Sequence, residues 1–126
     1  MAKLKRGELV PDVPQDPVFQ SLFRASVQPY LISWFKYDPR IEIAKLHVPM
    51  AIVGGTADLQ VPVADAKALK AAAPAAKLVI VEGMSHTLKH VAGADRAAQV
   101  AAYTDPSLPV EPAVVDAVAS TATSNG

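Results

Sequence analysis

Two short apolar runs, each followed at once by glycine, constrain the fold more than any other feature of the sequence. Residues 49–55 are Pro-Met-Ala-Ile-Val-Gly-Gly, and residues 77–83 are Lys-Leu-Val-Ile-Val-Glu-Gly. Because each run is apolar on both faces, each predicts a buried parallel strand rather than a half-exposed antiparallel one. Residues 61–73 between them are rich in strong helix formers and stop at a proline, which predicts a helix. The order strand, helix, strand indicates a βαβ unit.

Helices are expected on both sides of this unit. Apolar residues recur at helical spacing over residues 19–37, and Pro29 predicts a kink there or two shorter helices. Asp38 followed by proline is typical of a helix start, here for a short helix through Leu46. Two more helices are expected at residues 94–103 and 112–120. The aromatic residues of the first helix are expected to pack in the core, although they could also line an acyl pocket: Phe19, Phe23, Tyr30 and Trp34.

The fold class predicted is α/β, with two parallel strands flanked by helices. We expect one partial domain over residues 19–120, an extended proline-rich arm over residues 1–18 and a disordered polar tail over residues 121–126. Two strands are too few for a parallel sheet that is covered on both faces. We therefore expect the sheet to be completed by oligomerisation or by N-terminal strands that the chain lacks.

Composition excludes several classes of function. The 12 basic residues balance the 12 acidic ones, so no global charge attracts nucleic acid or an anionic membrane. No apolar run is long enough for a membrane span, and no signal peptide follows the basic N-terminus, so a cytoplasmic protein is expected. The absence of cysteine excludes disulfides, thiolate-bound zinc and a cysteine nucleophile. No cofactor is predicted.

Asp58 and His86 are the candidate catalytic residues, and each lies in a loop directly after a predicted strand. Since parallel strands present their carboxyl ends at the same edge of a sheet, the two side chains are expected to lie close together. A carboxylate in contact with an imidazole fixes its tautomer and stabilises the imidazolium as a proton arrives. The pair would therefore suit a general base.

The motif that joins these residues resembles the closing third of α/β-hydrolases. It consists of a strand, Gly-x-x-Asp-x-x-Val-Pro, a helix, and a second strand ending in Gly-x-x-His, and the resemblance extends over about residues 19–120. The nearest members are bacterial esterases and serine-aminopeptidase-like hydrolases. The resemblance implies that Asp58 and His86 are the acid and the base of a Ser-Asp-His triad. It also implies a carboxylesterase-type reaction on a small ester or acyl substrate.

The nucleophile of such a triad is missing. It should lie upstream of the acid in a Gly-x-Ser-x-Gly elbow, but Ser21, Ser26 and Ser33 have no flanking glycines and fall in a predicted helix. Ser85 adjoins His86, and neighbouring side chains on a loop point apart. No oxyanion-hole segment of the His-Gly-Gly-Gly type is present. The chain is therefore expected to be inactive alone, as the C-terminal portion of a serine ester hydrolase.

Other interpretations of these residues remain open. Asp58 could have no role other than to cap the turn before the next helix, and His86 could be an ordinary loop histidine. Asp65 is a rival acid that is expected to be a solvated helix position, and His47 is expected to be structural. His86 and His90 have the spacing of a helical zinc pair, but the glutamate of His-Glu-x-x-His and a third ligand are absent.

Two further functions stand beside the hydrolase portion. The chain could be a binding or assembly module that is derived from the same fold and has lost catalysis. It could also be a minimal enzyme that uses His86 and Asp58 with another nucleophile or with water, although the missing elbow disfavours this. In the first two cases exposed strand edges favour a homo-oligomer or pairing with a missing N-terminal half.

Overall fold

The chain divides into two compact units. A computed structural model describes residues 1–92 and 95–124, and the units are Met1–Glu42 and Ile43–Gly126. The boundary lies inside the predicted domain of residues 19–120, so that domain is not a single unit. The physical reason is local packing, because the helices at residues 2–5 and 28–34 contact each other within the first unit. Both predicted strands and both candidate catalytic residues belong to the second unit.

The first unit contains short helices only. They are α1 (Ala2–Lys5), α2 (Pro17–Phe23), α3 (Gln28–Trp34) and α4 (Pro39–Ile43), which ends at the boundary. The prediction of an extended arm over residues 1–18 is therefore wrong at both ends of that range. Residues 2–5 form α1, and residues 17–18 belong to α2. Leu4 is only 2% exposed and α1 packs against α3, so a tertiary contact stabilises a turn that the local sequence did not indicate.

The aromatic residues of this unit do not form the predicted core. The helix breaks into α2 and α3, as the proline in this region predicted. Phe19, Tyr30 and Trp34 are each about half exposed, at 48%, 56% and 60%. The rings contact neighbours on their own helix, with centroids 5.9 Å apart for Phe19 and Phe23 and 4.8 Å apart for Tyr30 and Trp34.

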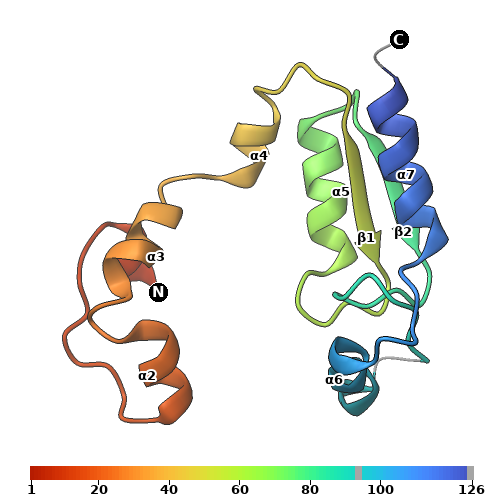
Figure 1. Cartoon of the computed structure of the whole chain (residues 1–126). Helices are drawn as coiled ribbons and strands as arrows, with labels where there is room; N and C mark the ends of the chain where they lie inside the picture. The colour runs from red at the N-terminus through yellow and green to blue at the C-terminus, as the bar shows by residue number, and fades with distance from the viewer. Residues whose placement is uncertain (93–94, 125–126) are drawn as a thin grey trace. The chain divides into compact units, whose positions relative to one another are not determined.

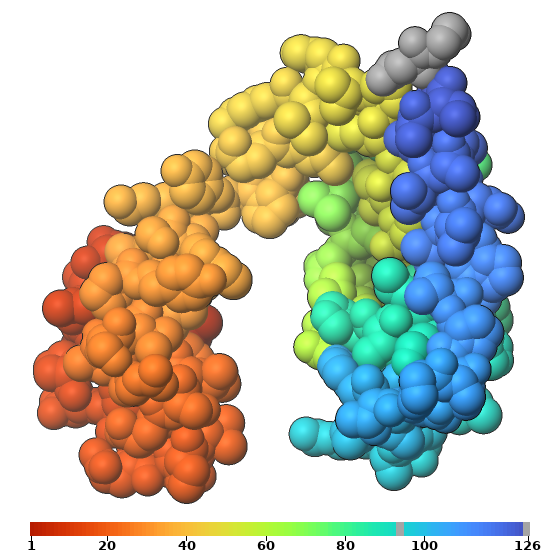
Figure 2. Space-filling model, in the orientation of Figure 1, coloured from red at the N-terminus to blue at the C-terminus, as the bar shows by residue number. Residues whose placement is uncertain are grey.

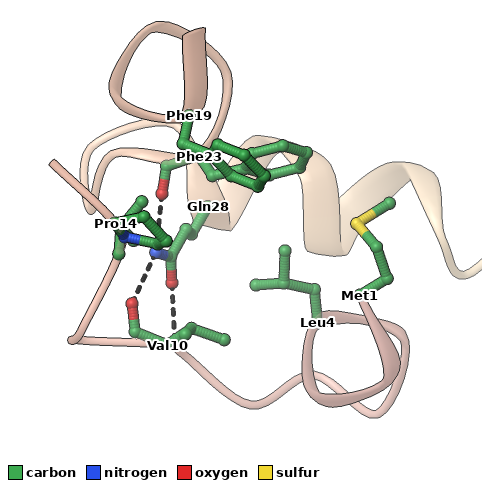
Figure 3. A pocket seen from close by; sticks show the side chains of 8 residues that line it. Met1, Leu4, Val10, Pro14, Phe19, Phe23 and Gln28 are labelled. Atoms are coloured by element: carbon green, nitrogen blue, oxygen red, sulfur yellow. Dashed lines mark hydrogen bonds between the residues drawn. The ribbon is translucent and has the colours of Figure 1, made fainter. Parts of the chain in front are cut away.

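Gln28 anchors the first unit instead (Figure 3). Its side chain is 1% exposed, and its amide accepts a hydrogen bond from the Val10 backbone nitrogen and donates to the carbonyls of Val10 and Phe23, all at 2.7–2.8 Å. Beside it lies a hollow of about 170 Å³ that is lined mostly by apolar side chains, among them Leu4 and Phe19. Because the polar atoms of Gln28 are bonded to backbone, the hollow offers an apolar surface.

The second unit is built on the predicted βαβ unit (Figure 1). Strand β1 (Ala51–Gly55) pairs in parallel with β2 (Lys77–Val81), with Ala51 beside Lys77 and Gly55 beside Val81. Helix α5 (Val63–Ala72) connects the strands. The sequence prediction of two parallel strands joined by a helix is confirmed, and the structure is a small α/β fold.

The two faces of the sheet are covered by different helices (Figure 1). Ile52 faces α5, where it packs with Ala66 in a buried cluster. Val53 and Val81 face α7 (Pro112–Thr123), where Val114 completes a second cluster. Successive strand residues thus point to opposite layers, which explains why both runs are apolar throughout.

The remaining elements close the carboxyl end of the sheet. Helix α6 (Arg96–Thr104) begins at Asp95, whose side chain accepts hydrogen bonds from two backbone nitrogens of the first turn. Figure 2 shows α6 and the loop after β2 gathered at this end of the unit. Lys89 of that loop donates from Nζ to the carbonyls of Ala102 and Asp105 at 2.9 and 2.6 Å, which binds the loop to the end of α6.

The last helix, α7, extends further than the sequence indicated. It reaches Thr123 rather than Ser120, and hydroxyls of its last turns donate to carbonyls three or four residues earlier. The first residues of the expected disordered tail are therefore helical, while residues 125–126 lie outside the described part of the chain. No helix within residues 1–92 and 95–124 is long and apolar enough to cross a membrane.

Candidate active site

The loop that carries Asp58 lies directly on the end of β2. Gly55 is buried, and a Cβ atom at this position would lie 2.0 Å from the carbonyl oxygen of Met84, so only glycine allows the two backbones to approach this closely. The next two residues extend the contact, since the backbone nitrogens of Thr56 and Ala57 donate to the carbonyls of Val81 and Met84 at 3.0 and 3.1 Å. The acid loop is thereby fixed on the strand that leads to the histidine.

The loop that carries His86 is fixed by the same contacts from the other side. Gly83 has a φ of +71°, a conformation that favours glycine, and its nitrogen donates to Oγ1 of Thr56 at 2.9 Å. Ser85 then donates from its backbone nitrogen to the Lys89 carbonyl at 3.0 Å, which closes the loop. A tight loop of this kind holds the intervening His86 close to the end of β1.

Asp58 and His86 are in direct contact, as their positions after neighbouring strands predicted. Oδ2 of Asp58 lies 2.9 Å from Nδ1 of His86. The other carboxylate oxygen accepts hydrogen bonds from the backbone nitrogens of Gln60 and Val61 at 2.8 and 2.9 Å. Asp58 therefore caps its turn and also contacts the histidine, so the structure combines the two roles that the sequence left as alternatives.

The ionisation of Asp58 favours this arrangement. Burial acts to raise the pKa of Asp58, but hydrogen bonds from the Val61 backbone, the His86 ring and the Gln60 backbone outweigh it, so the pKa is lowered from its usual value. The carboxylate is thus ionised at neutral pH and accepts the Nδ1 proton of His86. In the neutral form of the ring, a proton on Nδ1 places the lone pair on Nε2, which bonds to no residue within the described ranges.

A hollow of about 230 Å³ opens beside this pair. The Asp58 side chain is mostly buried at 11% exposure, whereas the His86 ring is 40% exposed and lines the hollow. The rest of the lining is mainly apolar and comes from β1, α5 and the two loops, and it includes Val61 and Leu88. Asp65, the rival acid, also lines the hollow but lies in the exposed first turn of α5, as predicted for a solvated position.

Ser85, which adjoins His86 in the sequence, is not placed to act as the nucleophile. Ser85 is 2% exposed, and its hydroxyl bonds to Oγ1 of Thr87 and donates to the Lys89 carbonyl at 2.9 and 3.0 Å. The upstream serines all belong to the helical first unit, and none lies between a strand and a helix as an elbow requires. They are Ser21, Ser26 and Ser33.

His90 belongs to a second histidine–carboxylate pair. Its Nδ1 lies 3.0 Å from Oε1 of Glu111, just before α7, and its ring lies over Gly83 with 66% exposure. His86 and His90 thus bond to different carboxylates instead of converging on a zinc ion. Within the described residues no three histidine, aspartate or glutamate side chains are grouped to hold a metal. His47, the remaining histidine, is exposed in the segment before β1.

Several residues that build the site could not be singled out from the sequence. Thr56 supports the histidine loop through its hydroxyl, and Lys89 binds α6, although neither stands in a recognisable catalytic motif. The one local signal was the Gly-Gly pair before Thr56, since consecutive glycines at a strand end indicate a close backbone approach. Glu111 gave no signal, because its partner lies 21 residues away.

Comparisons with known proteins found no relative of this chain. No family model, no curated protein and no solved structure matches it. The description of the site therefore depends on its geometry only. Asp58 and His86 are in contact at the carboxyl end of the two parallel strands of a small α/β unit. The resemblance to α/β-hydrolases stays a prediction from the residues quoted above.

Proposed function

We propose that this chain supplies the acid and the base of a serine ester hydrolase of the α/β-hydrolase type, while the nucleophile comes from a different polypeptide segment. The observation that carries the proposal is the contact between Asp58 and His86, 2.9 Å from Oδ2 to Nδ1, beside a hollow at the carboxyl end of parallel strands. In open parallel sheets this edge is where ligands bind. The mainly apolar hollow fits a small ester or acyl group.

The chemistry follows from the two ring nitrogens. Nδ1–H of His86 donates to Asp58, so Nε2 can accept the hydroxyl proton of a serine as its oxygen attacks the ester carbonyl carbon. The carboxylate stabilises the imidazolium that forms. The proton then passes from Nε2 to the departing alkoxide when the bond between the carbonyl carbon and the alcohol oxygen breaks. Water repeats the cycle on the acyl-enzyme and releases the acid.

The direct test measures hydrolysis of p-nitrophenyl acetate by the chain alone and with added methanol or hydroxylamine as an external nucleophile. His86 should accelerate these reactions as a general base, typically by about 10²–10⁴-fold in a complete site and less here. His86→Ala should abolish the acceleration, and Asp58→Asn should reduce it. Equal rates for the wild type and His86→Ala would sink the proposal.

The chain offers a matched control in its other histidine–carboxylate pair. His90 has a carboxylate partner at 3.0 Å and is more exposed than His86, but it lies outside the hollow. His90→Ala should therefore keep the full rate, and an equal loss in both variants would mean surface imidazole chemistry only. Fluorophosphonate should label no serine of the chain. Labelling that disappears in His86→Ala would instead show that the chain holds its own nucleophile.

The alternative of a non-catalytic assembly module makes the opposite prediction for these assays. In that case neither histidine variant changes the rate, and only the association of the chain depends on the sheet.

A further inference from the structure

Leu88, two residues after His86, has a backbone conformation that favours glycine. Its φ is +62°, and within residues 1–92 and 95–124 it is the one residue other than glycine with a positive φ. It ends a three-residue loop between Ser85 and Lys89, whose backbones are joined by a hydrogen bond of 3.0 Å. The last position of such a loop ordinarily takes glycine in this left-handed conformation. A leucine at this position therefore needs an explanation.

Backbone hydrogen bonds fix the conformation of Leu88 from both sides. Its nitrogen donates to the Ser85 carbonyl at 3.0 Å, and its carbonyl accepts from the Glu111 nitrogen at 2.8 Å. Both polar groups of the Leu88 backbone are thus bonded, and neither bond involves the side chain. The geometry of the loop accordingly requires a residue with a positive φ here and gives no reason for a leucine.

The Leu88 side chain does not account for the core either. It belongs to none of the three buried apolar clusters of the described residues, and the residue is 39% exposed. It does line the hollow that His86 also lines. Backbone strain that the surrounding structure maintains is concentrated at ligand sites. The leucine is therefore explained by the hollow rather than by the fold.

The size and the lining of the hollow define the kind of ligand that fits it. A cavity of about 150 Å³ is enough for one benzene molecule, so a hollow of about 230 Å³ has room for an apolar group of roughly six to eight carbon atoms. Ile52, Leu69 and Leu88 give it apolar walls, and no lysine or arginine of the described residues lines it. The hollow thus offers no counter-ion to an anionic ligand and favours a neutral apolar chain.

We propose that this hollow binds the acyl chain of the substrate and that Leu88 determines which chain is accepted, namely a neutral acyl group of about six to eight carbon atoms. The word substrate rests on the proposed function, whereas binding of the chain requires no catalysis. Leu88 contacts the acyl chain, and the ester carbonyl lies toward Nε2 of His86. Leu88 is thus a specificity-determining residue, and its strained backbone is kept because the side chain shapes the acyl site.

The test uses hexanamide, an unreactive neutral mimic of the acyl part, and follows the imidazole signals of the full chain by nuclear magnetic resonance. The sequence has 3 histidines, so His86→Ala identifies the His86 signal by its loss. Hexanamide should shift this signal with a dissociation constant on the order of 1 mM. Acetamide and hexanoate should bind at least about fivefold more weakly. His47 and His90 do not line the hollow, and their signals should not shift.

Two variants remove the Leu88 side chain, and a third is the matched control. Leu88→Ala should raise the dissociation constant for hexanamide by about fivefold. Leu88→Gly should do the same, and because glycine suits the positive φ, its weaker binding cannot be attributed to unfolding. Leu59→Ala should bind like the wild type, since Leu59 is 53% exposed in the acid loop and does not line the hollow. An unshifted His86 signal, or equal dissociation constants in the Leu88 and Leu59 variants, would overturn the proposal.

Binding and hydrolysis can fail separately, which distinguishes this inference from the proposed function. If hexanamide binding depends on Leu88 while His86→Ala leaves the hydrolysis of p-nitrophenyl acetate unchanged, the proposed function is wrong and the acyl site is supported. If the hydrolysis depends on His86 while hexanamide leaves the His86 signal in place, the proposed function is supported and the role of Leu88 is wrong.

Discussion

Replacing Gly55 by alanine should destabilise the second unit far more than the same change at Gly54. The added Cβ at residue 55 would lie 2.0 Å from the Met84 carbonyl oxygen and 2.7 Å from the carbonyl carbon. At residue 54 the nearest atoms are the Cβ of Ala66 at 3.1 Å and the Cδ1 of Ile80 at 3.4 Å, so α5 must move by only a few tenths of an ångström and the Ile80 contact is an ordinary one. The two glycines are adjacent, so they form a matched pair.

The magnitude follows from what must move. To reach an ordinary separation, Met84 must retreat by about 1 Å, although it is 1% exposed and packed against β2 and α7. Strain of this kind costs about 1–3 kcal/mol. The retreat also weakens the hydrogen bond from Ala57 to Met84, worth about 1 kcal/mol. We expect a loss of about 3 kcal/mol for Gly55→Ala and at most about 1 kcal/mol for Gly54→Ala. Both substitutions reduce the conformational entropy of the unfolded chain by the same amount, so this effect cancels when the two variants are compared.

Urea unfolding followed by far-ultraviolet circular dichroism measures both values. Tryptophan fluorescence is unsuitable, because the single tryptophan, Trp34, belongs to the first unit. Gly55→Ala should also reduce any hydrolysis that depends on His86, since Gly55 is the point where the acid loop meets the histidine loop. Free energies of unfolding within about 0.5 kcal/mol of each other for the two alanine variants would show that the Met84 carbonyl does not restrict residue 55.

Three other changes test separate features of the second unit. The pKa of Asp58 is lowered in the folded chain, so its ionisation stabilises the fold above the unfolded value of 3.8 and ceases to do so as the pH falls through the lowered value. The stability difference between the wild type and Asp58→Asn should therefore be constant near neutral pH and shrink below about pH 4 in urea titrations; a difference that grows there would contradict it. Lys89→Met removes two charged hydrogen bonds to the end of α6 and should lower the free energy of unfolding by about 2 kcal/mol in the same assay. An unchanged free energy of unfolding would contradict this prediction. Leu88 has a φ of +62°, so Leu88→Gly should raise the melting temperature by relieving about 1 kcal/mol of backbone strain, and a fall would show that its side-chain contacts dominate.

The sequence was sufficient for the parts of the fold that depend on local pattern. Both strands, the helix between them and the contact of Asp58 with His86 followed from apolar runs, glycine stops and the geometry of parallel strand ends. These elements are set by residues within a few positions of one another, apart from the single step that places the two strand ends side by side.

What the sequence did not predict depends on tertiary contacts. Trp34 and its aromatic neighbours have the spacing of a buried face, but the helix breaks and leaves them half exposed. Gln28 is polar and yet is buried, because the Val10 backbone and the Phe23 carbonyl satisfy its amide. Residue spacing alone identifies neither outcome, since each depends on which distant backbone group meets the side chain.

The separation of Asp58 and His86 along the chain also has a consequence for how the site assembles during folding. Asp58 bonds to backbone groups two and three residues ahead, so its carboxylate can be oriented as soon as that turn forms. His86 lies 28 residues away and reaches it only after α5 has brought β2 beside β1. Closing a loop of this length is entropically costly and comes later than turn formation. In a refolding experiment, formation of the contact between the His86 ring and Asp58 should therefore mark the moment at which the strand–helix–strand unit closes.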